Sequence, residues 1–173
     1  MTPRDLIVLL DCGDTIIDES SQVVDDSGLV IAGDVIPGAD HMVRDLADHG
    51  FRIGLVADGR RAAFERLLAQ HHIRDCFETL ICSDVVGEEK PSALMFRTAL
   101  SSLGLAPQDA GRCVMVGNNL SRDVVGARRM GITAIHLAWT DRYPKHPATD
   151  EEVPDHTIDL PEQLLPLLLR IDD

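Results

Sequence analysis

Short, almost continuously apolar runs recur along the chain, separated by longer segments that mix apolar and polar residues. Such a run is typical of a strand whose two faces are both buried in a sheet. The runs predict strands at residues 6–10, 52–56, 79–82, 113–116 and 133–137, with a last edge strand at 156–158. The segments between them carry helix signals, such as a starting proline or serine and a closing glycine. They predict helices at residues 38–49, 60–71, 92–103, 121–130 and 161–169.

The alternation of strands and helices predicts an α/β fold made of parallel βαβ units. Helices on both faces of the sheet would give three layers in a doubly wound arrangement. The length of 173 residues fits a single domain, 1–173. Ser121 is the expected N-cap of the helix at 121–130. Residues 139–154, with three prolines and mixed charges, predict a long surface loop.

The segment 20–35 departs from this alternation. Two apolar, largely β-branched runs, Val23-Val24 and Leu29-Val30-Ile31, flank an Asp-Ser-Gly turn, which is a pattern typical of a β-hairpin. The hairpin follows the polar stretch at the end of the first strand and would overhang that strand end. It is either a decoration or a flap over a site, and its position favours the flap.

Composition and charge narrow the classes of partner. Hydrophobic residues make up 45% of the chain and aromatic residues only 3%, so the core must consist of Leu, Val, Ile and Ala. The net charge of −13 argues against nucleic acid as a partner. The four cysteines form no CxxC pair and predict buried free thiols in a reducing compartment. No apolar stretch approaches the ~20 residues that span a bilayer, and no signal-like N-terminus is present, so we expect a cytoplasmic protein without a membrane partner.

Polar clusters follow four of the predicted strands. They are Asp11-Cys12-Gly13-Asp14-Thr15, Ala57-Asp58-Gly59, Gly87-Glu88-Glu89-Lys90-Pro91 and Gly117-Asn118-Asn119-Leu120-Ser121-Arg122-Asp123. In a parallel sheet the ends of these strands lie at one edge, where ligands of open α/β sheets bind. The clusters would bring carboxylates, amides and one lysine into one crevice. Acid and lysine together suit a metal-assisted phosphoryl site.

The chain resembles the haloacid dehalogenase-like hydrolase superfamily in the order, spacing and strand context of all four clusters. Lys90-Pro91, followed by Met95-Phe96, looks like the third motif of the phosphatase branch, and the stretch from Gly117 to Ala127 looks like the fourth. The resemblance implies a Rossmann-like core and a covalent mechanism. Asp11 would attack phosphorus and form an aspartyl-phosphate.

The resemblance also implies roles for the other motif residues. Mg²⁺ would be bound by Asp11, the backbone carbonyl of Gly13 and the side chain of Asn118. Lys90 would neutralise charge at the nucleophile, and Asp123 would hold Lys90 or a metal-bound water. The phosphate would be bound by backbone N–H groups and side chains at Cys12, Asp14, Asp58, Gly59 and Asn119.

Three positions depart from the family's phosphatase pattern. Gly13 stands where the family has an aspartate that serves as general acid and base, and Asp14 is displaced from that position by one residue. Ala57 replaces a hydroxyl residue, and Asn118 replaces a metal-binding aspartate. General acid–base catalysis contributes typically ~10²–10⁴-fold in rate. The sequence therefore predicts a slow Mg²⁺-dependent phosphatase, and the alternative is a catalytically impaired relative that binds a phosphorylated ligand or a protein partner.

The segments between the motifs are too short for a separate cap domain. In this family, members without a cap act on large substrates or use a neighbouring subunit as a lid. The expected partner is therefore a phosphorylated small molecule or a larger phosphorylated substrate. A homo-oligomer is also compatible with this arrangement. A dehalogenase is a weaker alternative because nothing would enclose a small haloacid. Asp58 is expected to face solvent or to bind Arg60, and Trp139 and Tyr143 to line the crevice or anchor the loop.

Overall fold

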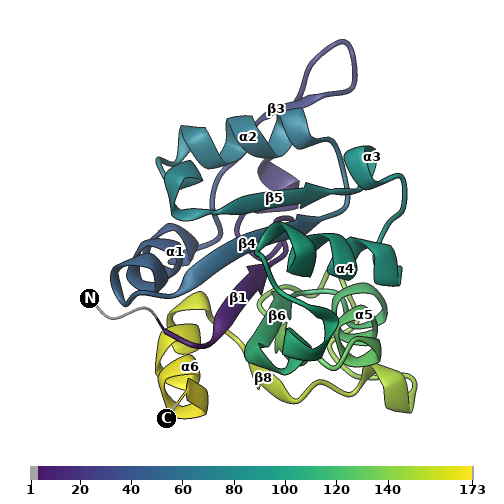
Figure 1. Cartoon of the computed structure of the whole chain (residues 1–173). Helices are drawn as coiled ribbons and strands as arrows, with labels where there is room; N and C mark the ends of the chain where they lie inside the picture. The colour runs from purple at the N-terminus through teal and green to yellow at the C-terminus, as the bar shows by residue number, and fades with distance from the viewer. Residues whose placement is uncertain (1–3, 173) are drawn as a thin grey trace.

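A sheet of six parallel strands forms the centre of the computed structural model, which describes residues 4–172 (Figure 1). Its strand order is β5-β4-β1-β6-β7-β8. The strands are β1 (Ile7–Leu10), β4 (Arg52–Ala57), β5 (Thr79–Cys82), β6 (Cys113–Gly117), β7 (Thr133–Leu137) and β8 (His156–Ile158). Every strand expected from the apolar runs is present, and the predicted α/β class with a parallel sheet is confirmed.

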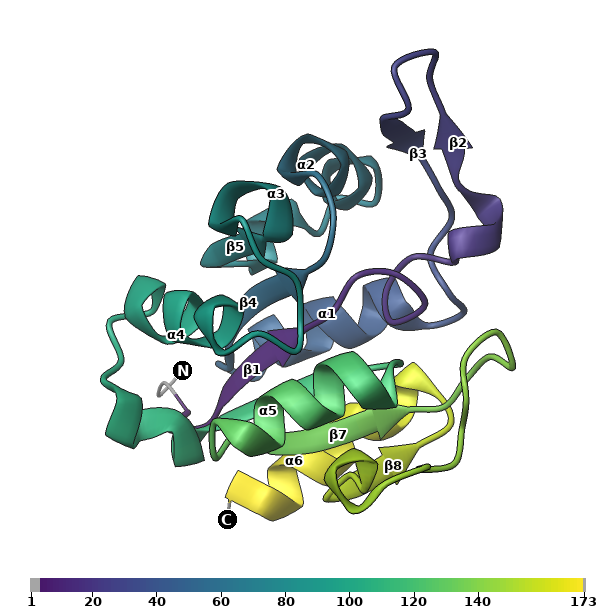
Figure 2. The ribbon, with the colours of Figure 1, turned by 90° about the vertical axis from the view of Figure 1, so that its right-hand side faces the viewer.

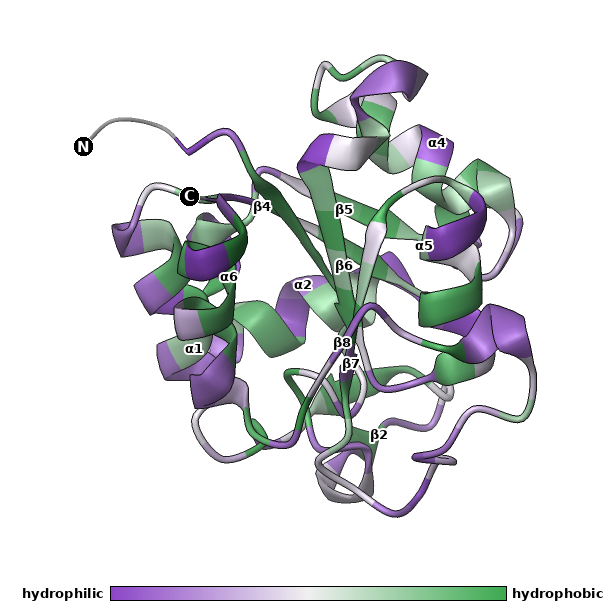
Figure 3. Ribbon diagram, turned by 90° about the horizontal axis from the view of Figure 1, so that it is seen from below, coloured by the Kyte–Doolittle hydropathy of each residue, from purple (hydrophilic) through white to green (hydrophobic). Residues whose placement is uncertain are grey.

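Helices cover both faces of this sheet. They are α1 (Ala39–Asp48), α2 (Arg61–Gln70), α3 (Ser83–Val86), α4 (Ala93–Ser102), α5 (Val125–Arg129) and α6 (Leu164–Asp172). Side chains of β1 alternate between two cores: Val8 and Leu10 pack with α1, α2 and α6, whereas Ile7 and Leu9 pack with α4 and the residues around α5. Seen along the sheet, α1 and α6 lie on one side and α4 and α5 on the other (Figure 3). This period-two alternation is what a strand buried on both faces requires.

The strand register brings the ends of β1, β4 and β6 to the same level. Leu10 pairs with Leu55 on one side and with Val116 on the other. The backbone N–H of Asp11 continues the ladder by donating to the Val116 carbonyl at 2.9 Å. The polar clusters that follow these strands therefore begin side by side.

The predicted helix at 121–130 begins differently from the expectation. Residues Leu120–Val124 form a π-helical turn that leads into α5, and its N-cap is Asn119 rather than Ser121. Asn119 Oδ1 accepts hydrogen bonds from the Arg122 N–H at 3.2 Å and from the Ser121 hydroxyl at 2.9 Å. The observed cap differs from the predicted one because the amide side chain of Asn119 reaches the free N–H groups of the first turn. Ser121 does not act as the cap, since its hydroxyl donates to Asn119.

Short 3-10 turns interrupt several connections and were not predicted. They span Glu19–Ser21, Arg74–Cys76, Pro107–Arg112, Asp150–Glu152 and Pro161–Gln163. The last of these takes the first residues of the predicted helix at 161–169, so α6 begins at Leu164 and extends to Asp172.

The hairpin expected at 20–35 is confirmed. It consists of β2 (Val23–Val24) and β3 (Val30–Ala32), which pair in antiparallel fashion outside the main sheet (Figure 2). At its base, Gly33 exchanges two hydrogen bonds with the side-chain amide of Gln70 on α2, at 3.0 and 3.2 Å. The hairpin is therefore anchored to a helix that borders the carboxyl ends of the strands.

The loop at 139–154 is also confirmed, apart from the 3-10 turn within it. The four cysteines are free thiols, and burial raises the pKa of Cys113 to about 11. Among the described residues no helix combines the length and apolar character needed to cross a membrane.

Candidate active site

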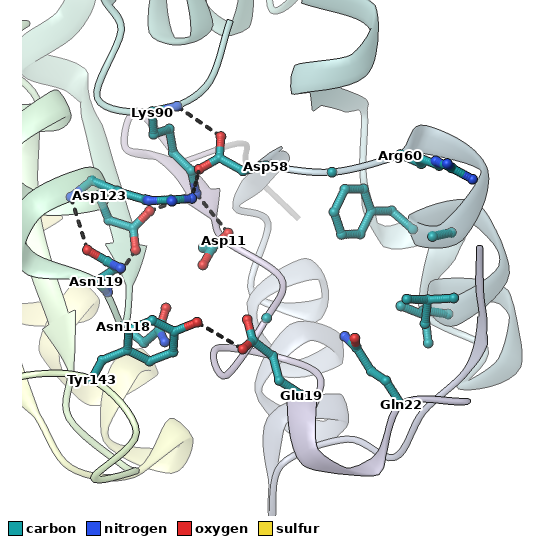
Figure 4. A pocket seen from close by; sticks show the side chains of 17 residues that line it. Asp11, Glu19, Gln22, Asp58, Arg60, Lys90, Asn118, Asn119, Asp123 and Tyr143 are labelled. Atoms are coloured by element: carbon teal, nitrogen blue, oxygen red, sulfur yellow. Dashed lines mark hydrogen bonds and ion pairs between the residues drawn. The ribbon is translucent and has the colours of Figure 1, made fainter. Parts of the chain in front are cut away.

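Lys90 is the centre of the site at the carboxyl ends of the strands. Its Nζ lies 2.7 Å from Asp11 Oδ1 and 2.7 Å from Asp123 Oδ1, and it donates to the Val56 carbonyl at 2.8 Å (Figure 4). Lys90 and Asp123 are buried, with 4% and 1% of their surface exposed, and Asp11 retains 9%. All three donors of the ammonium are thus satisfied inside the protein, which a buried lysine requires.

Asp58 positions the loop that carries Lys90. Its Oδ1 accepts the backbone N–H of Lys90 at 2.9 Å, and its Oδ2 lies 3.2 Å from the guanidinium of Arg122. The expectation that Asp58 faces solvent or binds Arg60 is wrong, because both oxygens are taken by these partners. Arg60 instead points toward the hairpin, where it reaches the Ser27 carbonyl at 3.4 Å.

Asp123 is fixed from its other side. Its Oδ2 accepts the backbone N–H of Asn119 at 2.9 Å, so both oxygens are engaged. Gly117 at the end of β6 lies against this side chain, and a Cβ at that position would come within 2.7 Å of the Asp123 Cβ. A glycine is needed there because any side chain would displace Asp123.

Burial and the ion pairs together determine the charge state of the cluster. Burial raises the pKa of Asp11 to about 7, and the Lys90 ammonium opposes that rise. Burial works to lower the pKa of Lys90, but Asp11 and Asp123 together raise it above its usual value. Lys90 therefore stays protonated and offers positive charge beside Asp11. The contact of Lys90 with Asp11 is made to Oδ1.

A cavity of about 200 Å³ opens in front of Asp11. Among the site residues predicted from the sequence, those that line it are Asp11, Gly13, Asp58, Gly59, Lys90, Asn118, Asn119 and Asp123. Its outer wall is formed by α2 and the hairpin, through apolar side chains that include Val30, Phe64 and Leu67. The structure thus brings together the four clusters, as expected for segments that follow the strands of a parallel sheet.

Cys12 and Asp14 do not line this cavity. Cys12 is 1% exposed and packs in the core, and burial raises the pKa of its thiol. Asp14 is fully buried, and its carboxylate accepts hydrogen bonds from the Arg142 guanidinium, at 2.8 Å from Nε, and from the Glu19 N–H at 3.1 Å. Its own N–H donates to the Ile17 carbonyl. Asp14 therefore ties the 139–154 loop to the turn after β1.

Glu19 and Tyr143 line the cavity and were not assigned a catalytic role from the sequence. The Tyr143 hydroxyl donates to Glu19 Oε2 at 2.9 Å, and burial, followed by Glu19, raises the pKa of Tyr143 to about 12. In Figure 4 this pair lies on the side of the cavity opposite Lys90 and Asp58, with Asp11 between them. The partners are 124 residues apart, so no local spacing could reveal the pair.

The donor set around Asp11 fits a hard cation such as Mg²⁺. Asp11, Gly13 and Asn118 all line the cavity. Asp11 could supply a carboxylate, Asn118 its amide oxygen and Gly13 its backbone carbonyl. Mg²⁺ is commonly held by one or two carboxylates together with water and substrate phosphate. No group of three or more His, Cys, Asp or Glu side chains suited to a metal occurs in residues 4–172, so any ion here would depend on oxygen ligands of other kinds.

A family model for haloacid dehalogenase-like hydrolases matches residues 9–131. The chain belongs to this family. The match covers more than half of the chain and contains Asp11, Lys90 and Asp123, which confirms the resemblance drawn from the four motifs.

Curated phosphatases are similar to this haloacid dehalogenase-like chain. A glyceraldehyde 3-phosphate phosphatase from Methanopyrus kandleri is 32% identical over 138 residues, covering 80% of this chain and 56% of the relative. The phosphoserine phosphatase of Thermus thermophilus is 32% identical over 119 residues, covering 69% and 45%. The chain thus spans about half the length of these relatives.

Solved structures of the family share the fold. The magnesium-bound HAD-hydrolase YfnB from Bacillus subtilis superposes with a TM-score of 0.76 at 16% identity, covering 95% of this chain and 99% of that one. A HAD phosphatase from Thermococcus onnurineus gives a TM-score of 0.76 at 20% identity, covering 94% and 97%.

Proposed function

We propose that this haloacid dehalogenase-like protein is a Mg²⁺-dependent phosphatase that acts on a phosphorylated small molecule through an aspartyl-phosphate at Asp11. The observation that carries the proposal is the buried Lys90 ammonium held at 2.7 Å from both Asp11 and Asp123. The similarity to several curated phosphatases supports the same class of reaction.

The geometry supports a two-step transfer. Oδ2 of Asp11 attacks phosphorus, the bond from phosphorus to the leaving oxygen breaks, and the aspartyl-phosphate forms. Water then attacks phosphorus, and the bond to Asp11 breaks to release inorganic phosphate. Lys90 stays in contact with Oδ1 and offsets the negative charge that gathers as the phosphate approaches.

Asp11, Asn118 and the Gly13 carbonyl are the residues that would hold Mg²⁺. When bound, the ion would supply positive charge to the phosphate oxygens that face Asp11. Asn118 carries no charge, and Asp123 has both oxygens engaged. We therefore expect Mg²⁺ affinity to be lower than in a site with two carboxylate ligands.

The cavity favours a small phosphomonoester. Its volume of about 200 Å³ suits a compact molecule, and its wall offers apolar contacts from Phe64 and Leu67 beside polar ones from Gln22 and Arg60. Ala57 is buried, with 1% of its surface exposed, and supplies no hydroxyl to the phosphate. We therefore expect the phosphate to bind more weakly than it would beside a hydroxyl at this position.

The proposal predicts Mg²⁺-dependent phosphate release that requires Asp11. Purified protein is incubated with a panel of small phosphomonoesters, with Mg²⁺ or with a chelator, and free phosphate is measured. Asp11→Asn should abolish release because the amide is a poor nucleophile. Asp5→Asn is the matched control, since Asp5 precedes the same strand and its side chain is 98% exposed.

Release that persists in Asp11→Asn would overturn the covalent mechanism. A wild-type protein that binds Mg²⁺ or a phosphorylated ligand yet releases no phosphate would instead support the alternative function, a catalytically impaired relative that binds a ligand. Gly13, Ala57 and Asn118 are the residues that motivate this alternative.

A further inference from the structure

We propose that Glu19 is a catalytic residue that donates a proton to the leaving oxygen and later takes one from the attacking water. The inference rests on the proposed phosphatase function and adds a role that the four motifs do not contain. Glu19 lies outside them, in the 3-10 turn that leads into the hairpin.

Glu19 fills the space above Gly13. A Cβ placed on Gly13 would come within 3.0 Å of the Glu19 Cδ and 3.1 Å of its Cγ, with the carboxylate oxygen Oε1 nearer still. The Glu19 carboxylate therefore occupies the place that a side chain at position 13 would take, and it lines the same cavity as Asp11. A glycine at position 13 is what permits this approach.

The other carboxylates of the cavity are committed elsewhere. Asp58 accepts from the Lys90 backbone and from Arg122, and Asp123 accepts from Lys90 and from Asn119. Asp11 is the nucleophile. Glu19 uses Oε2 for Tyr143, and no described residue donates a hydrogen bond to Oε1. Glu19 is thus the carboxylate lining the cavity that can exchange a proton with a substrate.

Two contacts hold Glu19 in place. The Tyr143 hydroxyl donates to Oε2 at 2.9 Å, and the backbone N–H of Glu19 donates to Asp14 at 3.1 Å. Asp14 is in turn bound by Arg142. A proton-transfer group must be fixed within hydrogen-bond reach of the reacting atom, and these contacts restrict both the backbone and the side chain of Glu19.

The proton balance closes over one turnover. As the ester bond breaks, the leaving oxygen takes a proton from the Glu19 carboxyl group and departs as an alcohol. The resulting carboxylate then removes a proton from water as that water attacks the aspartyl-phosphate. Phosphate leaves, and Glu19 regains its proton.

The test compares leaving groups that differ in their need for a proton. Wild type, Glu19→Gln and the control Glu162→Gln, whose carboxylate is exposed outside the cavity, are assayed with glycerol phosphate and with p-nitrophenyl phosphate. For Glu19→Gln, kcat/KM for glycerol phosphate should fall by roughly 10²–10⁴-fold, while kcat/KM for the aryl ester changes little because nitrophenolate leaves without a proton. Phosphorylated Asp11 should accumulate with the aryl ester, since the second step lacks its base.

Tyr143→Phe provides a second variant that keeps the ring and removes the hydrogen bond to Glu19. It should show the same preference for the aryl ester in weaker form. An equal fall of kcat/KM for both esters, or a weaker dependence on Mg²⁺ as the only change, would overturn the proton-transfer role. Wild-type protein that hydrolyses neither ester would overturn the proposed function itself, whereas an active wild type with an unselective Glu19→Gln overturns this inference alone.

Discussion

At the scale of single residues, the site depends on charges that are buried only because each has a partner. Lys90 contacts the carboxylates of Asp11 and Asp123 and one backbone carbonyl. Without Lys90, each of these carboxylates would lose its cationic partner. Removing one member of a buried ion pair costs far more than removing an exposed one. The proposed mechanism therefore predicts that Lys90 contributes to both catalysis and stability.

Lys90→Met tests this dual role. The substitution keeps the length of the side chain and removes the charge, which leaves Asp11 and Asp123 facing each other without a cation. We expect the free energy of unfolding, measured by urea denaturation, to fall by about 3–5 kcal/mol, and phosphate release to fall at least ~10²-fold. Lys145→Met, at a partly exposed loop lysine, should change neither. An unchanged urea midpoint for Lys90→Met would contradict the account.

Gly117→Ala tests the close packing behind Asp123. The added methyl group would meet the Asp123 side chain, so we expect lower stability together with reduced phosphate release. Gly111→Ala is the matched control, because no atom lies within 4 Å of its Cβ position and its backbone is not left-handed. That control should be neutral or stabilising by up to about 1 kcal/mol. If the two substitutions changed stability and phosphate release equally, the contact with Asp123 would not be the reason that position 117 requires glycine.

At the scale of elements, strands were predicted more accurately than helix starts. The runs at Thr79–Cys82, Thr133–Leu137 and His156–Ile158 have the predicted bounds, because turn residues or polar residues flank each apolar run. The N-cap of the turn before α5 was misplaced by two residues, at Ser121 instead of Asn119. A serine and an asparagine are both good N-caps, and only the three-dimensional course of the chain decides which side chain reaches the free N–H groups.

Asn119→Ala and Ser121→Ala distinguish these two caps. Loss of the Asn119 side chain removes the acceptor for the Arg122 N–H, so we expect a loss of about 0.5–2 kcal/mol in the free energy of unfolding. Ser121→Ala should cost less, since its hydroxyl only donates to Asn119. Thermal or urea unfolding of both variants measures the difference, and the reverse order would restore Ser121 as the cap.

At the scale of the whole molecule, the site is assembled from segments far apart in the chain. The convergence of Asp11, Lys90 and Asp123 could be predicted, because parallel strands place their following clusters at one edge. The contacts of Asp14 with Arg142 and of Glu19 with Tyr143 could not, since they depend on how the loop at 139–154 folds back over the turn after β1. Irregular loops carry no period from which such contacts can be derived.

Arg142→Gln tests this long-range attachment. Asp14 is fully buried and would lose its guanidinium partner, so we expect a lower Tm in a thermal melt and a reduced kcat on alkyl phosphates as Glu19 loosens. Arg97→Gln, on an exposed position of α4, is the matched control and should leave both unchanged. If Arg142→Gln matched that control in both measurements, the loop would not hold the site.

The central claim is that Asp11 carries the phosphoryl group during turnover. The most direct measurement is acid quenching of Glu19→Gln during reaction with p-nitrophenyl phosphate and Mg²⁺, followed by peptide mass mapping. The account predicts a phosphoryl group on the peptide that contains Asp11, assigned to that residue by fragmentation, and none in the Asp11→Asn, Glu19→Gln double variant. Turnover without any phosphoryl group on Asp11, together with phosphate release that persists in Asp11→Asn, would contradict it.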